Sequence, residues 1–192
     1  MEINQRLESL RTLMKERNID MYLVPTSDYH NSENVGKYFM ERAYISGFTG
    51  SAGSVLVGKD WAGLWTDGRY FLQAEDQLEG SGIDLYRMGQ EGVPSLEGFL
   101  EEKLGLGEKL AFDGRCVTYG QGLVLEKIVA ENKGSLVYDI DLIDQVWGDR
   151  PPMAREPIFE LQIRYAGESR ADKLGRLRSA MENIGADCHI IT

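Results

Sequence analysis

The side chains that could do chemistry gather in polar segments of the first half of the chain. Asp28, His30 and Glu33 lie within six residues of one another, between Pro25 and Asn34. Carboxylate and imidazole groups at such a spacing could hold a metal ion or relay a proton. The spacing is equally compatible with a hydrogen-bonded loop in which Asp28 caps a turn and His30 lies near the surface. The loop is the simpler interpretation.

A second polar segment reads Asp67-Gly68-Arg69-Tyr70. Arg69 and Tyr70 could hold a polar ligand. The simpler alternative is a turn in which Asp67 caps the following helix and Arg69 forms a local ion pair.

Between these segments lies a glycine-dense stretch, residues 47–53, which reads GFTGSAG. A phosphate-binding loop would supply backbone N–H groups at the start of a helix. Here the glycines lead into the strand-like run 54–57, and neither phosphate-binding motif fits. A nucleophile elbow centred on Ser51 also fails, because Thr49 stands where the motif needs glycine and no helix follows. The stretch therefore indicates a structural turn.

Cysteine and histidine usage excludes several metal sites. Cys116 and Cys188 lie far apart, and His30 and His189 are the only histidines. No zinc-finger spacing and no HExxH motif is present. Two reduced thiols are a simpler interpretation than a disulfide.

Composition narrows the class of protein. The chain has 192 residues, and 21 Lys and Arg against 31 Asp and Glu give a net charge of −10. That charge argues against a nucleic-acid partner and against a polybasic membrane anchor. The sequence contains neither an apolar run long enough to span a bilayer nor a signal-peptide core. We therefore expect a cytoplasmic protein.

Hydrophobic patterning predicts alternating helices and strands. Asn4 can cap the first helix, and a hairpin is expected at 54–66. This alternation indicates an α/β fold, a mixed β-sheet covered by helices in three layers. The expected helices are near 4–17, 37–44, 69–78, 96–104, 119–131 and 171–184, and the expected strands are 21–24, 54–57, 62–66, 83–88, 109–113 and 135–139.

A boundary is predicted where Trp147-Gly148-Asp149-Arg150 meets Pro151-Pro152, because adjacent prolines fit neither a helix nor a central strand. The expected domains are 1–150 and 151–192. A shift of 167 residues places Leu7, Leu10, Arg11, Met14 and Asp20 on Leu174, Leu177, Arg178, Met181 and Asp187. This repeat suggests that 151–192 holds a linker and the truncated start of a second, similar domain. The apolar run 187–192 is then expected to be its first strand.

Several of these stretches together resemble one family. They resemble Xaa-Pro aminopeptidase (aminopeptidase P), in the N-terminal, creatinase-type domain of its long three-domain form. Two positions depart from the usual pattern, Tyr29 and Asn34, and leave the role of the loop between Asp28 and Glu33 open. The stretches that carry the resemblance are 27–33, 42–53, 65–71, 147–151, 165–167 and 172–173.

The resemblance implies a creatinase N-terminal, ribonuclease H-like sandwich and a parent metallopeptidase. That hydrolase removes the first residue from peptides whose second residue is proline. Its two divalent metals, commonly manganese, are bound by a C-terminal domain that would lie beyond Thr192. No catalytic residue, metal ligand or cofactor is therefore expected in this chain. The expected partners are the missing catalytic domain and a second copy in a dimer, and peptide substrate only in the full-length protein.

The resemblance also suggests a role for the N-terminal domain in shaping the entrance of the active site. We expect the following residues to lie near that entrance or at an interdomain contact: Asp28, His30, Arg42, Phe48, Arg69 and Tyr70. Alternatives are a stand-alone binding or dimerisation module, and a fragment of a prolidase or creatinase relative. The coding sequence past Thr192 separates the first alternative from the leading hypothesis.

Overall fold

The chain divides into two units in a computed structural model that describes residues 2–191. The first unit is Met1–Ala154 and the second is Arg155–Thr192. Each unit is described by itself.

A six-stranded mixed sheet forms the centre of the first unit, in the order β4-β3-β2-β1-β5-β6. Strand β2 runs antiparallel to both of its neighbours, while the other neighbouring pairs are parallel. The predicted hairpin is present, and Gly58 N–H donates to the Trp61 carbonyl at its turn. The strands are β1 Met21–Pro25, β2 Ser54–Val57, β3 Ala62–Thr66, β4 Asp84–Arg87, β5 Lys109–Ala111 and β6 Ser135–Val137.

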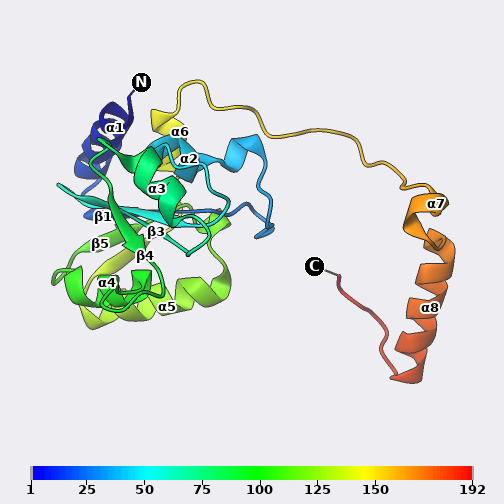
Figure 1. Ribbon diagram of the computed structural model, residues 1–192. Helices are drawn as coiled ribbons and strands as arrows, with labels where there is room; N and C mark the ends of the chain where they lie inside the picture. The colour runs from blue at the N-terminus through cyan, green and yellow to red at the C-terminus, as the bar shows by residue number, and fades with distance from the viewer. Residues whose placement is uncertain (1, 192) are drawn as a thin grey trace. The chain divides into compact units, whose positions relative to one another are not determined.

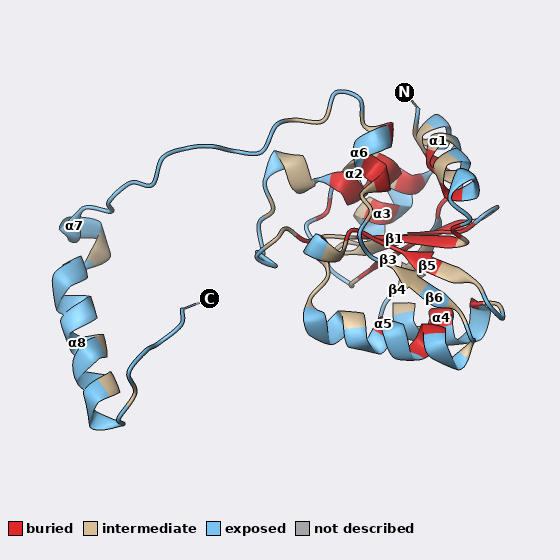
Figure 2. Cartoon of the chain, turned by 180° about the vertical axis from the view of Figure 1, so that it is seen from behind, coloured by how far each residue is buried: buried red, intermediate tan, exposed pale blue. Residues whose placement is uncertain are grey.

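Helices cover both faces of this sheet (Figure 1). One face packs against α1 Ile3–Glu16, α2 Glu41–Ser46, α3 Phe71–Leu78 and α6 Leu142–Val146, and the other against α4 Leu96–Lys103 and α5 Tyr119–Glu131. Successive side chains of a strand point to opposite faces. Accordingly, Tyr22 and Val24 join the first core, whereas Met21 and Leu23 join the second. The buried residues follow the sheet and its helices in Figure 2, and the predicted three-layer α/β fold is confirmed.

The ends of several elements differ from the sequence prediction. Helix α1 begins at Ile3, with Gln5 accepting a hydrogen bond from the Glu2 N–H. Asn4 is therefore not the cap; its amide instead donates to the Gly80 carbonyl. The weakly helical segment splits into a short 3₁₀ turn, η1 Lys37–Phe39, and α2. Another 3₁₀ turn, η2 Gly114–Cys116, and helix α6 were not predicted, because each is too short to show a periodic pattern.

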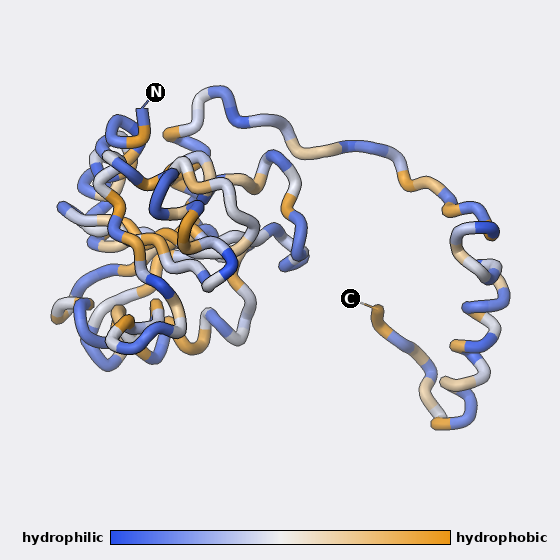
Figure 3. Tube along the Cα trace, viewed as in Figure 1, coloured by the Kyte–Doolittle hydropathy of each residue, from blue (hydrophilic) through white to orange (hydrophobic). Residues whose placement is uncertain are grey.

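The second unit contains two helices, α7 Ile163–Ala166 and α8 Arg170–Asn183. Ser169 caps α8 by accepting from the Asp172 N–H at 3.1 Å. None of the described residues of this unit is buried, and its apolar residues Ile158, Phe159 and Ile163 are exposed. Figure 3 shows apolar positions scattered along the unit. The predicted strand at 187–192 is wrong over 187–191, and Thr192 lies outside the described residues. A strand needs a neighbouring strand for its backbone hydrogen bonds, and none of the described residues supplies one.

Candidate functional site

The predicted site residues lie around one end of the sheet. Strands β1 and β3 both run antiparallel to β2, so their carboxyl ends meet at the edge where β2 begins. Such edges are where α/β sheets commonly bind ligands. A cavity of about 420 Å³ opens there. Its lining includes Thr26, Ser32, Glu33, Ser51, Asp67 and Arg69.

Arg42, on α2, ties two segments of this edge together. Its Nε donates to Thr26 Oγ1 at 2.6 Å, Nη1 donates to the Phe48 carbonyl at 2.9 Å, and Nη2 donates to the Gly50 carbonyl. The residue is only 5% exposed, and burial lowers its pKa to about 10. All three acceptors are neutral, so Arg42 acts here as a clamp between the end of β1 and the glycine-dense turn.

The glycines of that turn answer steric needs. A Cβ on Gly50 would lie 2.3 Å from the Phe48 ring and 2.8 Å from the Tyr70 ring. Gly53 has φ +151°, and a Cβ there would lie 2.8 Å from the Trp65 carbonyl oxygen. The residues lead directly into β2. The structural-turn interpretation is therefore confirmed.

Phe48 and Tyr70 meet beside the turn. Their ring centroids are 6.0 Å apart in an edge-to-face arrangement, and the Arg42 guanidinium lies 4.7 Å from the Phe48 ring centroid. Tyr70 Oη and Ser51 Oγ are hydrogen-bonded at 2.6 Å. Phe48 is fully buried, whereas Tyr70 is partly exposed. The structure thus brings Arg42, Phe48 and Tyr70 together.

Arg69 forms the local pair that the sequence suggested. Its Nε and Nη2 donate to the two carboxylate oxygens of Asp67, each at 2.8 Å. This pairing lowers the pKa of Asp67 and raises that of the exposed Arg69. Asp67 accepts a hydrogen bond from the Arg69 N–H and so caps the turn. It does not cap the helix, because α3 begins only at Phe71.

The loop that holds Asp28 is also organised by hydrogen bonds. Asp28 Oδ1 accepts from the backbone N–H groups of His30 and Ser32, each at 2.9 Å. These bonds, the one from Ser32 first, lower the pKa of Asp28. His30 is exposed, as expected for the loop interpretation. Within the described residues, Asp28, His30 and Glu33 do not form a group with metal-binding spacing.

A second cluster, of two carboxyl groups and a thiol, was not predicted from the sequence. Glu41, Asp113 and Cys116 are buried, and their potential ligand atoms lie within 4.8 Å of one another. Both carboxylates already bind guanidinium groups: Glu41 pairs with Arg150, and Asp113 with Arg115 at 2.8 Å. Burial raises the pKa of the Cys116 thiol to about 12, which opposes the thiolate that a metal needs. We therefore assign this cluster to an ion-pair network. The one sequence signal for it was the motif that contains Arg150.

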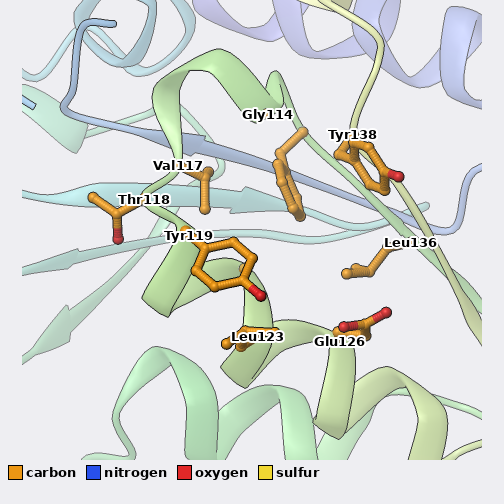
Figure 4. Close-up of a pocket in the computed structure, with 10 residues that line it drawn as sticks. Gly114, Val117, Thr118, Tyr119, Leu123, Glu126, Leu136 and Tyr138 are labelled. Carbon is orange, nitrogen blue, oxygen red and sulfur yellow. The ribbon is translucent and has the colours of Figure 1, made fainter. Parts of the chain in front are cut away.

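A separate cavity of about 320 Å³ lies between α5 and the edge strand β6. Figure 4 shows Tyr119, Leu123 and Glu126 projecting from α5 toward Leu136 and Tyr138. The lining is mostly apolar and contains none of the predicted site residues.

Comparison with known proteins assigns this fold to a family. The family model of the creatinase/prolidase N-terminal domain matches residues 6–145, and a second model with the same description matches residues 149–192. The chain belongs to the creatinase/prolidase N-terminal domain family.

The homologues of this chain are Xaa-Pro aminopeptidases, and the chain corresponds to their N-terminal domain. It is 39% identical to aminopeptidase P2 of Arabidopsis thaliana, over 99% of this chain and 27% of that protein. An X-prolyl aminopeptidase structure from Caenorhabditis elegans, described as a cytosolic enzyme with a di-nuclear active site, aligns with a TM-score of 0.85 and 31% identity. That alignment covers 97% of this chain and 32% of that one. The N-terminal domain of the cytoplasmic peptidase PepQ from Mycobacterium tuberculosis aligns with a TM-score of 0.55 and 26% identity, over 74% of this chain and 98% of that one.

The chain spans about a third or less of the length of the Xaa-Pro aminopeptidases it matches. A di-nuclear centre needs several carboxylate and histidine ligands around two ions. Residues 2–191 bring together one group of three potential ligands, and its carboxylates are already paired with arginines. These residues do not fit such a centre. Over the same residues, no helix is long and apolar enough to cross a bilayer.

Proposed function

We propose that this chain is the non-catalytic N-terminal portion of a cytoplasmic metalloaminopeptidase that removes the N-terminal residue from peptides with proline in second position. The single observation that carries the proposal is 39% identity to an aminopeptidase P over nearly the whole of this chain. The two divalent metals, with manganese as the expected ion, belong to the remaining length of that enzyme. Its own catalytic domain and a second copy in a homodimer are the proposed partners.

Within this portion, the edge at the ends of β1 and β3 is the proposed contact with the entrance of the active site. A peptidase confined to N-terminal residues must exclude internal chain, and an accessory domain can do so without touching the metals. The residues differ in exposure, and this difference limits what each of them can contact. His30 and Arg69 are exposed and can touch a neighbouring domain or peptide. Arg42 and Phe48 are buried and can act only by holding the turn beside Tyr70.

Activity measurements test the first half of the proposal. We expect the 192-residue chain to leave an Xaa-Pro peptide intact in the presence of Mn²⁺, because the described residues supply no di-nuclear site. The full-length protein should cleave the same peptide and lose activity with a chelator. Metal-dependent turnover by the 192-residue chain would contradict the proposal.

Substitution in the full-length enzyme tests the second half. The variants His30→Ala and Arg69→Ala remove exposed side chains from the proposed entrance. We expect altered selectivity for peptide length or altered oligomer size, measured by a peptide series and by light scattering. Lys127→Ala, an exposed residue of α5, is the matched control. If both entrance variants behave like the control, this edge does not shape access.

A further inference from the structure

The first unit holds a buried arginine just before its paired prolines. The Arg150 side chain is only 5% exposed. Its Nη1 donates to Asp141 Oδ2 at 2.7 Å and to Asp144 Oδ1 at 3.2 Å. Its Nη2 donates to Glu41, and its Nε donates to the Tyr38 carbonyl at 2.9 Å. The guanidinium also lies 3.8 Å from the centroid of the Tyr38 ring. Arg150 therefore ties the chain to the first unit directly before residues 151–162, which form neither helix nor strand and are called the linker below.

The charges around Arg150 do not balance. Three carboxylates, those of Glu41, Asp113 and Asp141, are at least nine-tenths buried, and the guanidiniums of Arg115 and Arg150 face them. One negative charge is left over. Among the described residues, the Tyr22 hydroxyl from β1 and the Cys116 thiol from η2 also face Glu41.

Protonation of Glu41 removes this excess negative charge. Burial, followed by the charge of Asp141, raises its pKa to about 7, although Arg150 acts in the opposite direction. Glu41 therefore gains and loses a proton near neutral pH. When it is protonated, its charge–charge attraction for Arg150 is lost, and only a hydrogen bond from the guanidinium to a neutral carboxyl oxygen remains.

We propose that Arg150 anchors the start of the linker on the first unit and that protonation of Glu41 loosens this anchor, so that the linker is held more firmly at pH 8 than at pH 6. The direction of this pH dependence follows from the thermodynamic linkage between protonation of Glu41 and release of Arg150. If Arg150 leaves, Glu41 stays beside the carboxylates of Asp113 and Asp141 without its cation, so the released state takes up a proton. Acid therefore favours release.

Asp144 supplies the matched control. It also accepts a hydrogen bond from Arg150, but its side chain is 57% exposed. Water screens such a contact, so Asp144 should contribute little to the anchor. Glu41→Gln, in contrast, imitates the protonated carboxyl at every pH.

Nuclear magnetic resonance of the 192-residue chain tests the proposal. The Arg150 Nε–H signal reports the bond to Tyr38, and its solvent exchange, corrected for the intrinsic pH effect, reports release. For a difference of one pKa unit between the anchored and released states, we expect exchange about fivefold faster at pH 6 than at pH 8. Glu41→Gln should show fast exchange at both pH values, and Asp144→Asn should behave like the unmodified chain.

A second measurement guards against loss of fold in a variant. The Glu41 carboxyl ¹³C shift of the unmodified chain should titrate near pH 7, and Arg150→Met should move that midpoint upward. Equal exchange at pH 6 and pH 8, an ordinary carboxylate midpoint for Glu41, or loosening by Asp144→Asn equal to that by Glu41→Gln would each overturn the proposal.

Discussion

The arginines of the first unit differ in what their burial demands. Arg42 and Arg150 are buried, so every hydrogen bond they make replaces water that the fold has removed. Arg69 is exposed and pairs with Asp67 in solvent. A buried charge that loses its partners is expensive, whereas a solvated pair contributes little. Substitutions at these positions should therefore differ strongly in cost.

For Arg42, we expect Arg42→Met to lower the free energy of unfolding by about 3 kcal/mol, because it takes the guanidinium donors away from the buried carbonyl oxygens of Phe48 and Gly50. The comparison variant Arg69→Met should change stability little. Urea unfolding followed by circular dichroism measures both. Equal costs for the two variants would show that Arg42 is no clamp.

Glu41 should make stability depend on pH. Its pKa in the folded chain is about 7, above the usual 4.5, so its contribution is fully present below pH 4.5 and is lost as pH rises through 7. The loss amounts to about 3 kcal/mol. The stability of Glu41→Gln relative to that of the unmodified chain should therefore increase as pH rises from 4.5 to 8. Urea unfolding at several pH values measures this difference. A constant difference across this range would contradict the assignment.

At the scale of elements, the glycine-dense turn 47–53 positions the residues at the proposed entrance. Directly before β2, Gly50 lies against the Phe48 and Tyr70 rings, and Gly53 lies against the Trp65 carbonyl oxygen of β3. The Gly53 carbonyl also accepts from the backbone N–H and the hydroxyl of Thr26 at the end of β1. The turn therefore connects β1, β2 and β3.

Alanine substitution should separate a required glycine from a dispensable one. Gly53→Ala should cost about 2 kcal/mol, because its φ of +151° and the Trp65 carbonyl oxygen leave no room for a Cβ. Gly122, within α5, has open space around its Cβ position, so Gly122→Ala should gain about 0.5 to 1 kcal/mol. Thermal unfolding of the two variants gives the signs, and a stabilising Gly53→Ala would refute the steric account.

At the scale of the whole molecule, the two units differ in how they are stabilised. Both hydrophobic cores lie in the first unit, formed by residues between Leu7 and Val146. The second unit buries none of its described residues. Because apolar burial is the main favourable term in folding, the first unit should account for the cooperative stability of the chain.

Truncation checks this expectation. Residues 1–154 alone should unfold cooperatively, with nearly the same midpoint temperature as the 192-residue chain. Residues 155–192 alone should show no cooperative transition, because a lone helix pair cannot bury an apolar face. Circular dichroism on heating measures both. A markedly lower midpoint for residues 1–154 would indicate that the second unit stabilises the first.

Local patterns in the chain were enough to predict much of the fold. Alternating apolar runs predicted the mixed sheet and its hairpin, and α4 and α5 begin at Leu96 and Tyr119, where the sequence placed them. Errors fell where a tertiary contact decides the end of an element. Asn4 binds the Gly80 carbonyl rather than capping α1, and Arg69 stays in a turn with Asp67 before α3.

The sequence by itself determined the layered α/β fold, the family and the polar segments around the end of β1, because propensity, periodicity and short motifs are local properties. Only the tertiary structure showed which polar residues are buried. Phe48 and Arg42 became internal supports, while Glu41, Asp113 and Arg150, far apart in the chain, became one network. Burial and charge balance depend on contacts between distant segments, and these contacts set the pKa of Glu41 and the hold on the linker.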